Sequence, residues 1–209
     1  MTARPLVALI DGPLPGARHK LHCALHPLAA ESPAARHAAV MAACIRAAAP
    51  KARFISHVIF PGRMSAAAAA AAAALSAAAE GGADVVHCSF GLPGKNPALA
   101  EAVAALLAAG KQVVASAPAQ GGPVYPAAFP GVHSVQGDAR CGPGQWSLLN
   151  LPGARFGACP RDAASGLAGA SVAAAHFTGL LARNLAAGRG AEMTGAAFQG
   201  RERRSGAAG

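Results

Sequence analysis

Ser171 is the residue of this 209-residue sequence whose type and setting best suit a nucleophile. It follows Gly169-Ala170 and opens an alanine-rich segment that is typical of a helix. At the start of a helix, backbone N–H groups lack partners within the helix and face the positive end of its dipole, so they could hold a developing oxyanion. The alternative is an ordinary helix-capping serine.

Asp11 and His37 could complete a catalytic group with this serine. Asp11 ends the apolar run Leu6–Ile10, which predicts a buried strand, and ligands of open α/β sheets gather where such strands end. His37 falls in the first turn of a predicted helix that Ser32 caps. Each residue alone could be structural, but Asp, His and Ser in this order form one of the known arrangements of a catalytic triad.

Strands and helices alternate along the chain. Predicted strands cover residues 6–10, 53–60, 83–88, 112–115 and 132–135; predicted helices cover 34–49, 66–80 with Ser65 as cap, 97–109, and 171 to about 187. The region 138–167 is predicted to be rich in loops. This alternation predicts βαβ crossovers and hence an α/β fold whose mostly parallel central sheet is flanked by helices.

The length predicts one domain, over residues 1–190, followed by a basic tail, 191–209, that contains Arg201, Arg203 and Arg204. With 18 basic and 9 acidic residues, the chain has a formal charge of +9, which favours an acidic partner. Nucleic acid is disfavoured as that partner, because no stacking aromatic residues or recognition module accompany the charge.

The sequence predicts a soluble, cytoplasmic protein without a membrane partner. The N-terminal residues enter the first strand with no sign of a secretory signal or propeptide, and the longest apolar stretch is short and nearly pure alanine. The five cysteines include no CxxC pair, so we expect free thiols.

A cluster of His19, His22, Cys23 and His26 would share one face if it were helical, as metal ligands do. The surrounding prolines indicate an irregular loop instead, and the spacing matches no familiar zinc site. Acidic residues are too sparse for calcium sites. We therefore expect no metal and no cofactor.

Seven segments carry a resemblance to a known family, in the family's order. They are Val7–Asp11 (V-A-V-I-D), His19 with Leu21 (H-P-D-L), His37–Ala43 (H-G-T-H-V-A-G), Ala49–Ala52 (A-P-x-A), His87–Gly91 (N-M-S-L-G), Tyr125–Val132 (Y-P-x-x-Y-P-x-V) and Gly169–Gly179 (G-T-S-M-A-S-P-H-V-A-G). Over residues 5–187 the chain therefore resembles a compact member of the subtilisin-like (S8) serine peptidases.

The resemblance implies a three-layer subtilisin-like fold and a role for each catalytic residue. Ser171 would be the nucleophile, His37 the base that takes its proton, and Asp11 the carboxylate that orients the imidazole. It also implies which residues bind the substrate: an extended peptide would pair with Ser89, Phe90 and Gly91, and the facing wall of the pocket would be Ala115, Ser116 and Ala117.

The sequence departs from the family at the oxyanion hole. Ala119 stands where the family has an asparagine that donates to the oxyanion, and loss of such a donor costs about 10² to 10³ in turnover in this family. We predict that the amide of Gln120, one residue further on, takes its place.

Together these features predict a serine endopeptidase that processes a specific intracellular precursor through an acyl-enzyme. It would resemble the small subtilisin-like enzymes of peptide maturation, including those that serve quinohemoprotein amine dehydrogenase. The expected partners are a peptide or small protein with an acidic leader, and other maturation enzymes. The alternative is a pseudoprotease that holds an extended peptide without cutting it, because the motif around His37 is eroded.

Overall fold

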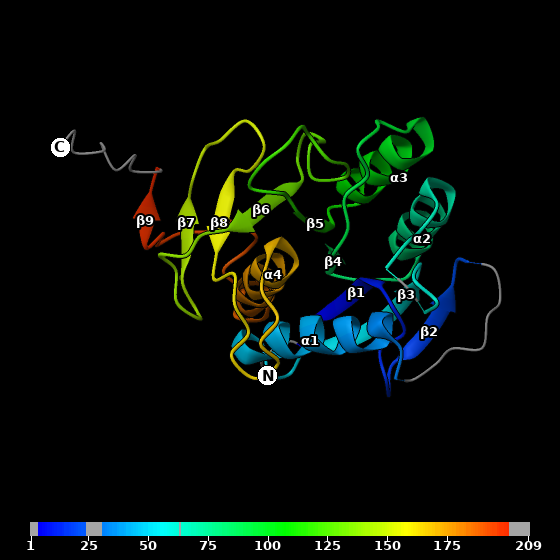
Figure 1. Ribbon diagram of the computed structural model, residues 1–209, viewed down its shortest axis with the longest axis horizontal. Helices are drawn as coiled ribbons and strands as arrows, with labels where there is room; N and C mark the ends of the chain where they lie inside the picture. Colours follow the sequence, from blue (N-terminus) through cyan, green and yellow to red (C-terminus); the bar gives the residue numbers. More distant parts are fainter. Residues whose placement is uncertain (1–3, 24–30, 63, 201–209) are drawn as a thin grey trace.

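The computed structural model describes residues 4–23, 31–62 and 64–200, which form a nine-stranded sheet and four helices (Figure 1). The strands are β1 Leu6–Asp11, β2 Arg18–Leu21, β3 Arg53–Val58, β4 Val85–Cys88, β5 Gln112–Ser116, β6 His133–Gly137, β7 Trp146–Leu148, β8 Phe156–Ala158 and β9 Phe198–Gln199. The helices are α1 Pro33–Ala48, α2 Ala68–Glu80, α3 Pro97–Ala108 and α4 Ala170–Ala186.

The sheet is mostly parallel, in the order β2-β3-β1-β4-β5-β6-β8-β7-β9, and β7 with β8 is its antiparallel pair. Side chains of β1 alternate between its two faces: Val7 and Leu9 pack with α1 and α4, whereas Ala8 and Ile10 pack with α2 and α3. Each face of the sheet is thus covered by two helices (Figure 1). The predicted α/β fold with helices on both sides of a mostly parallel sheet is confirmed.

Helices α1 and α4 pack against one another at Gly179. A Cβ atom at this position would lie 2.6 Å from the carbonyl oxygen of Ile45 and 3.2 Å from the Cβ of Ala48, closer than side chains tolerate. The small residues of both helices therefore let their backbones approach. This contact fixes the relative position of the two helices that carry His37 and Ser171.

Two sequence-based predictions about the elements are wrong in detail. Residues 18–21, expected in an irregular loop, form β2, which pairs with β3 at an edge of the sheet. Helix α2 begins at Ala68 after an Ala67 cap that makes no side-chain hydrogen bond, so Ser65 does not cap it. The region 138–167 is rich in loops, as expected, and also contains the short strands β7 and β8.

A partly buried ion pair lies beside strand β9. Arg140 donates to Asp138 (2.8 Å) and to the carbonyl of Gly200 (2.7 Å), and Ser147 Oγ donates to Asp138 (2.6 Å). Burial alone would raise the pKa of Asp138, but these hydrogen bonds and the Arg140 charge lower it to about 2. Strand β9, which pairs with β7, lies within the segment 191–209 that was expected to be a tail. The arginines of that segment, Arg201, Arg203 and Arg204, lie outside the described residues.

We predict that Gly179→Ala lowers the free energy of unfolding by about 1–3 kcal/mol, because the new methyl group forces α4 away from Ile45. For a chain of this size that corresponds to a fall in melting temperature of roughly 2–12 °C, measured by calorimetry. Gly153→Ala is the control, since its Cβ would meet nothing within 4 Å. Equal melting temperatures for the two variants would contradict the prediction.

Candidate active site

The end of β1 and the first turns of α1 bring Asp11 and His37 together. Asp11 is fully buried, and its carboxylate lies 2.9 Å from His37 Nδ1 through Oδ2 and 3.0 Å through Oδ1. The N–H of Gly12 donates to Asp11 Oδ1 at 2.7 Å. Since Nδ1 carries the proton shared with the carboxylate, Nε2 is the nitrogen of His37 that remains for proton transfer.

Local sequence explains why α1 can approach Asp11 so closely. Ser32 caps the helix by accepting from the N–H of Ala35 at 3.1 Å, and Pro33 opens its first turn. A Cβ at Gly12 would lie 2.3 Å from the carbonyl oxygen of Ala34. A glycine at this position is therefore what lets the start of α1 lie against the end of β1.

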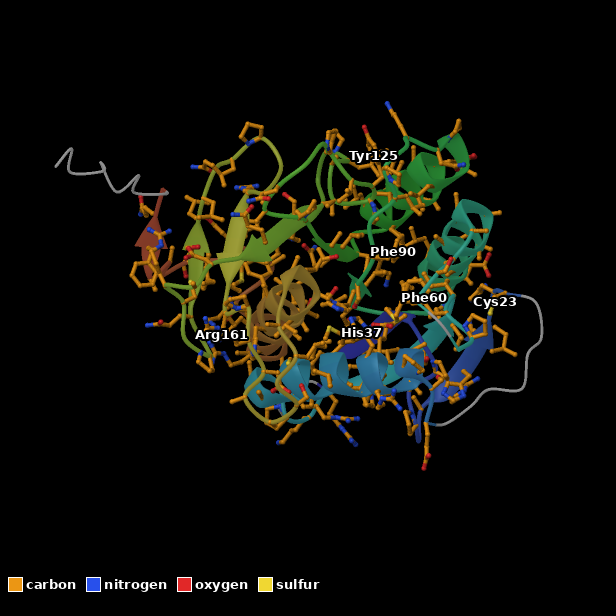
Figure 2. The ribbon with its side chains drawn as sticks, in the orientation of Figure 1. Cys23, His37, Phe60, Phe90, Tyr125 and Arg161 are labelled. Atoms are coloured by element: carbon orange, nitrogen blue, oxygen red, sulfur yellow. The ribbon has the colours of Figure 1, made fainter. Side chains whose placement is uncertain are left out.

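The carboxylate controls the protonation of His37. Burial opposes the charged imidazolium, but the hydrogen bond and the negative charge of Asp11 outweigh it, so the pKa of His37 lies above its ordinary value of 6.5. His37 lies between α1 and the end of β1 (Figure 2). Its side chain keeps 14% of its surface exposed. The imidazole is thus a strengthened base that is still reachable from solvent.

Ser171 is the second residue of α4, not its cap. The cap is Gly169, whose φ of 138° suits glycine, and the hydrogen bond from Ala173 N to Gly169 O is the first of the helix. The Ser171 N–H precedes that bond and remains at the positive end of the helix dipole. The ordinary capping role that the sequence left open is thereby removed.

The hydroxyl of Ser171 donates to the carbonyl oxygen of Ser89, at 3.4 Å. Within the described residues, no hydrogen bond joins Ser171 to His37. The structure therefore brings Asp11 and His37 into direct contact, and brings Ser171 to the start of the segment Ser89–Gly91.

The predicted substrate-binding residues lie at the ends of two neighbouring strands. Cys88 at the end of β4 pairs with Ala115 in β5, so Ser89–Gly91, which follow β4, lie at the same edge of the sheet as Ser116, the last residue of β5, and Ala117. Phe90 is 8% exposed, and Ala115, Ser116 and Ala117 are buried. The structure therefore brings the two segments to one edge of the sheet.

Gln120, the predicted oxyanion donor, is exposed in the loop after β5, as is Ala119. No hydrogen bond joins the Gln120 side chain to Ser171 in the described part of the chain. The role of Gln120 therefore remains a prediction.

An apolar groove of about 560 Å³ lies beside His37. It is lined by Pro33, Arg36, His37 and Val40 of α1 and by Met64, Ser165 and Leu167. Met64 and Leu167 are 45% and 36% exposed, and Met64 also lines a second groove along Ser89–Leu92. Sequence analysis missed both residues, because an isolated apolar residue in a loop carries no pattern.

The histidines considered as metal ligands serve different contacts. His19 Nε2 lies 2.7 Å from the carbonyl oxygen of Leu14, whereas His22 Nε2 lies 3.1 Å from His57 Nδ1. The fourth candidate, His26, lies outside the described residues. Among residues 4–23, 31–62 and 64–200, no group of three or more His, Cys, Asp or Glu side chains could hold a metal ion.

No helix in these ranges is long and apolar enough to span a membrane.

Several solved protease structures share this fold. The prenylagaramide maturation protease PagA matches with a TM-score of 0.65 and 17% identity, over 88% of this chain and 78% of its own. The protease domain of PatA matches with a TM-score of 0.65 and 21% identity, over 88% and 79%. A psychrophilic protease called S41 matches with a TM-score of 0.68 and 17% identity, over 90% and 79%.

These neighbours have subtilisin-like folds, and the predicted subtilisin-like architecture of this chain is thereby confirmed. No protein-family model and no curated protein sequence matches the chain. At such low identity, the likeness establishes the fold.

We predict that the titration midpoint of His37, followed by NMR, lies above 6.5 in the native chain and falls below 6.5 in Asp11→Asn. The substitution removes the carboxylate that favours the imidazolium and leaves the burial that disfavours it. Glu101→Gln, at an exposed position of α3, is the control and should leave the midpoint unchanged. A native midpoint at or below 6.5 would contradict this account of the site.

Proposed function

We propose that the protein is a serine endopeptidase of the subtilisin-like (S8) type with Asp11, His37 and Ser171 as its catalytic residues. The observation that carries the proposal is the fully buried Asp11 carboxylate, hydrogen-bonded at 2.9 Å to His37 Nδ1. This is the arrangement that fixes the tautomer of a general base. Ser171, at the open start of α4, supplies the hydroxyl.

In the proposed reaction, the Ser171 hydroxyl turns from the Ser89 carbonyl toward His37 by rotation about χ1. Its oxygen attacks the scissile carbonyl carbon while His37 Nε2 takes its proton, and Asp11 stays ionised. His37 then protonates the leaving amine as the C–N bond breaks, which leaves an ester on Ser171. Water, losing a proton to His37, attacks this ester. His37 then gives that proton to Ser171 Oγ as the ester C–O bond breaks, which releases the acid and restores the free serine.

The oxyanion of each tetrahedral intermediate would be held by the N–H of Ser171 and by the side-chain amide of Gln120. The first donor faces the start of a helix and needs no rearrangement. The second requires the exposed Gln120 side chain to turn toward Ser171. With a single donor in place, turnover would fall by about 10² to 10³, the loss recorded for removing one such donor from a subtilisin.

The proposed substrate is an extended peptide within a larger precursor. An extended chain can add to the segment Ser89–Gly91 through backbone hydrogen bonds, while the grooves beside it receive side chains. PagA is by its description a maturation protease, which supports precursor processing in this chain. The formal charge of +9 favours an acidic leader. We place the reaction in the cytoplasm, with other maturation enzymes as partners.

A pseudoprotease that holds a peptide without cutting it is the second candidate. It is favoured by the lack of a hydrogen bond between Ser171 and His37 within the described residues and by Ala119 at the position of the family's asparagine. Peptide binding at Ser89–Gly91 is common to both functions. The reactivity of Ser171 is what distinguishes them.

We predict that a fluorophosphonate probe labels the native chain at Ser171, as mass spectrometry of the digested protein would show. Peptides with acidic N-terminal halves should be cleaved, and Ser171→Ala should reduce cleavage on the order of 10⁶-fold, as loss of the nucleophile does in a comparable triad. Ser76→Ala, at an exposed position of α2, is the control and should behave as the native chain. Peptide binding without labelling or cleavage would instead establish the pseudoprotease.

We predict that Leu167→Asp reduces kcat/KM at least tenfold for peptides with leucine or phenylalanine beside the scissile bond, because it places a charge in the apolar groove at His37. Labelling by a small fluorophosphonate should stay within twofold, since that probe does not fill the groove. Leu21→Asp changes a similarly exposed leucine on β2 and is the matched control. Equal effects of both substitutions on peptide cleavage would exclude the groove as a specificity site.

A further inference from the structure

His87 is a buried histidine next to the candidate site that the proposed reaction does not use. It lies in β4, has no exposed surface, and has a partner at each ring nitrogen. Its Nδ1 lies 2.8 Å from Thr178 Oγ1, and its Nε2 lies 2.7 Å from Ser89 Oγ. Thr178 is likewise fully buried and Ser89 is 5% exposed, so the three side chains form a hydrogen-bonded chain shielded from water.

Two of these residues depart from the motifs that the sequence resembles. His87 stands where N-M-S-L-G has its asparagine, and Thr178 stands where G-T-S-M-A-S-P-H-V-A-G has its second-to-last residue, alanine. The structure brings the two departures into contact although they are 91 residues apart. Thr178 supplies a hydroxyl partner for Nδ1 of the buried His87 side chain, which would otherwise be left without one.

This chain links the nucleophile's helix to the segment beside the nucleophile. Thr178 lies seven residues after Ser171, which is two helical turns, so both side chains project from the same face of α4. Ser89 connects the two, because its side chain contacts His87 and its carbonyl oxygen accepts from the Ser171 hydroxyl. The position of the Ser89 carbonyl relative to α4 is thereby fixed at two points.

The imidazole of His87 is neutral under ordinary conditions. Burial, and secondarily the nearby His37, lower the pKa of His87 to about 3. A neutral imidazole offers one donor and one acceptor, and each hydroxyl can serve as either, so the chain is satisfied in either direction. With both nitrogens occupied and no exposed surface, His87 cannot act as a second base.

We propose that His87 is a positioning residue. Its hydrogen bonds to Thr178 and to the Ser89 side chain fix the place of the Ser89 carbonyl, which accepts from the Ser171 hydroxyl before reaction. The inference rests on the proposed function, because it assigns His87 a part in the reactivity of that serine. Replacing His87 or Thr178 alone leaves the buried polar group of the other without its partner, and the segment Ser89–Gly91 must shift to satisfy it. Removing both restores the pair of residue types in the resembled motifs.

The test measures the second-order rate of Ser171 labelling by a fluorophosphonate, well below each variant's melting temperature. His87→Asn and Thr178→Ala should each lower this rate about tenfold. The double variant His87→Asn/Thr178→Ala should return to within threefold of the native rate, which simple destabilisation would not produce. Thr178→Ser keeps the hydroxyl and is the control, with a rate within twofold of native.

If His87→Asn does not fold, Thr178→Ala and Thr178→Ser decide the question between them. Single variants that react at the native rate, or losses that multiply in the double variant, would overturn this inference alone. An unreactive Ser171 in the native chain would overturn the proposed function together with it. The two failures are therefore distinguishable by whether the native serine is labelled.

Discussion

The burial of a negative charge at Asp11 is the constraint on which the candidate site depends. A buried carboxylate costs several kcal/mol unless hydrogen bonds and an opposite partial charge compensate it. Here the N–H of Gly12 and Nδ1–H of His37 do so, and the second requires the start of α1 to lie against the end of β1. The same compensation raises the pKa of His37, so one contact positions the helix and prepares the base.

The second helix of the site is placed by close backbone contact. Gly179 of α4 lies against Ile45 of α1, and both helices are rich in alanine. Large side chains at this interface would hold the helix axes further apart, because interaxial distance follows the size of the residues in contact. The alanine-rich composition, which would otherwise indicate a weakly packed protein, is thus suited to bringing His37 and Ser171 to one edge of the sheet.

Sequence predicted the parts of the fold that depend on local pattern. Strand–helix alternation and short motifs were sufficient for the parallel sheet and for the contact between Asp11 and His37. The edge strand β2 was missed because its pairing with β3 is non-local and prolines surround it. The start of α2 was misplaced because an unbroken alanine run has the same helix propensity at every position. The contact of His87 with Thr178 joins residues 91 positions apart, and no spacing rule predicts it.

Under the proposed function, the resting position of the Ser171 hydroxyl connects peptide binding to chemistry. Its acceptor, the Ser89 carbonyl, begins the segment with which an extended peptide would pair. The hydrogen bond is long, at 3.4 Å, so little free energy opposes rotation of the hydroxyl toward His37. A peptide that pairs with Ser89–Gly91 brings its scissile carbonyl to Ser171. The hydroxyl attacks that carbonyl from the position in which it is turned toward His37. Because small ester and amide substrates cannot make this pairing, the arrangement favours cleavage of an extended precursor over indiscriminate hydrolysis.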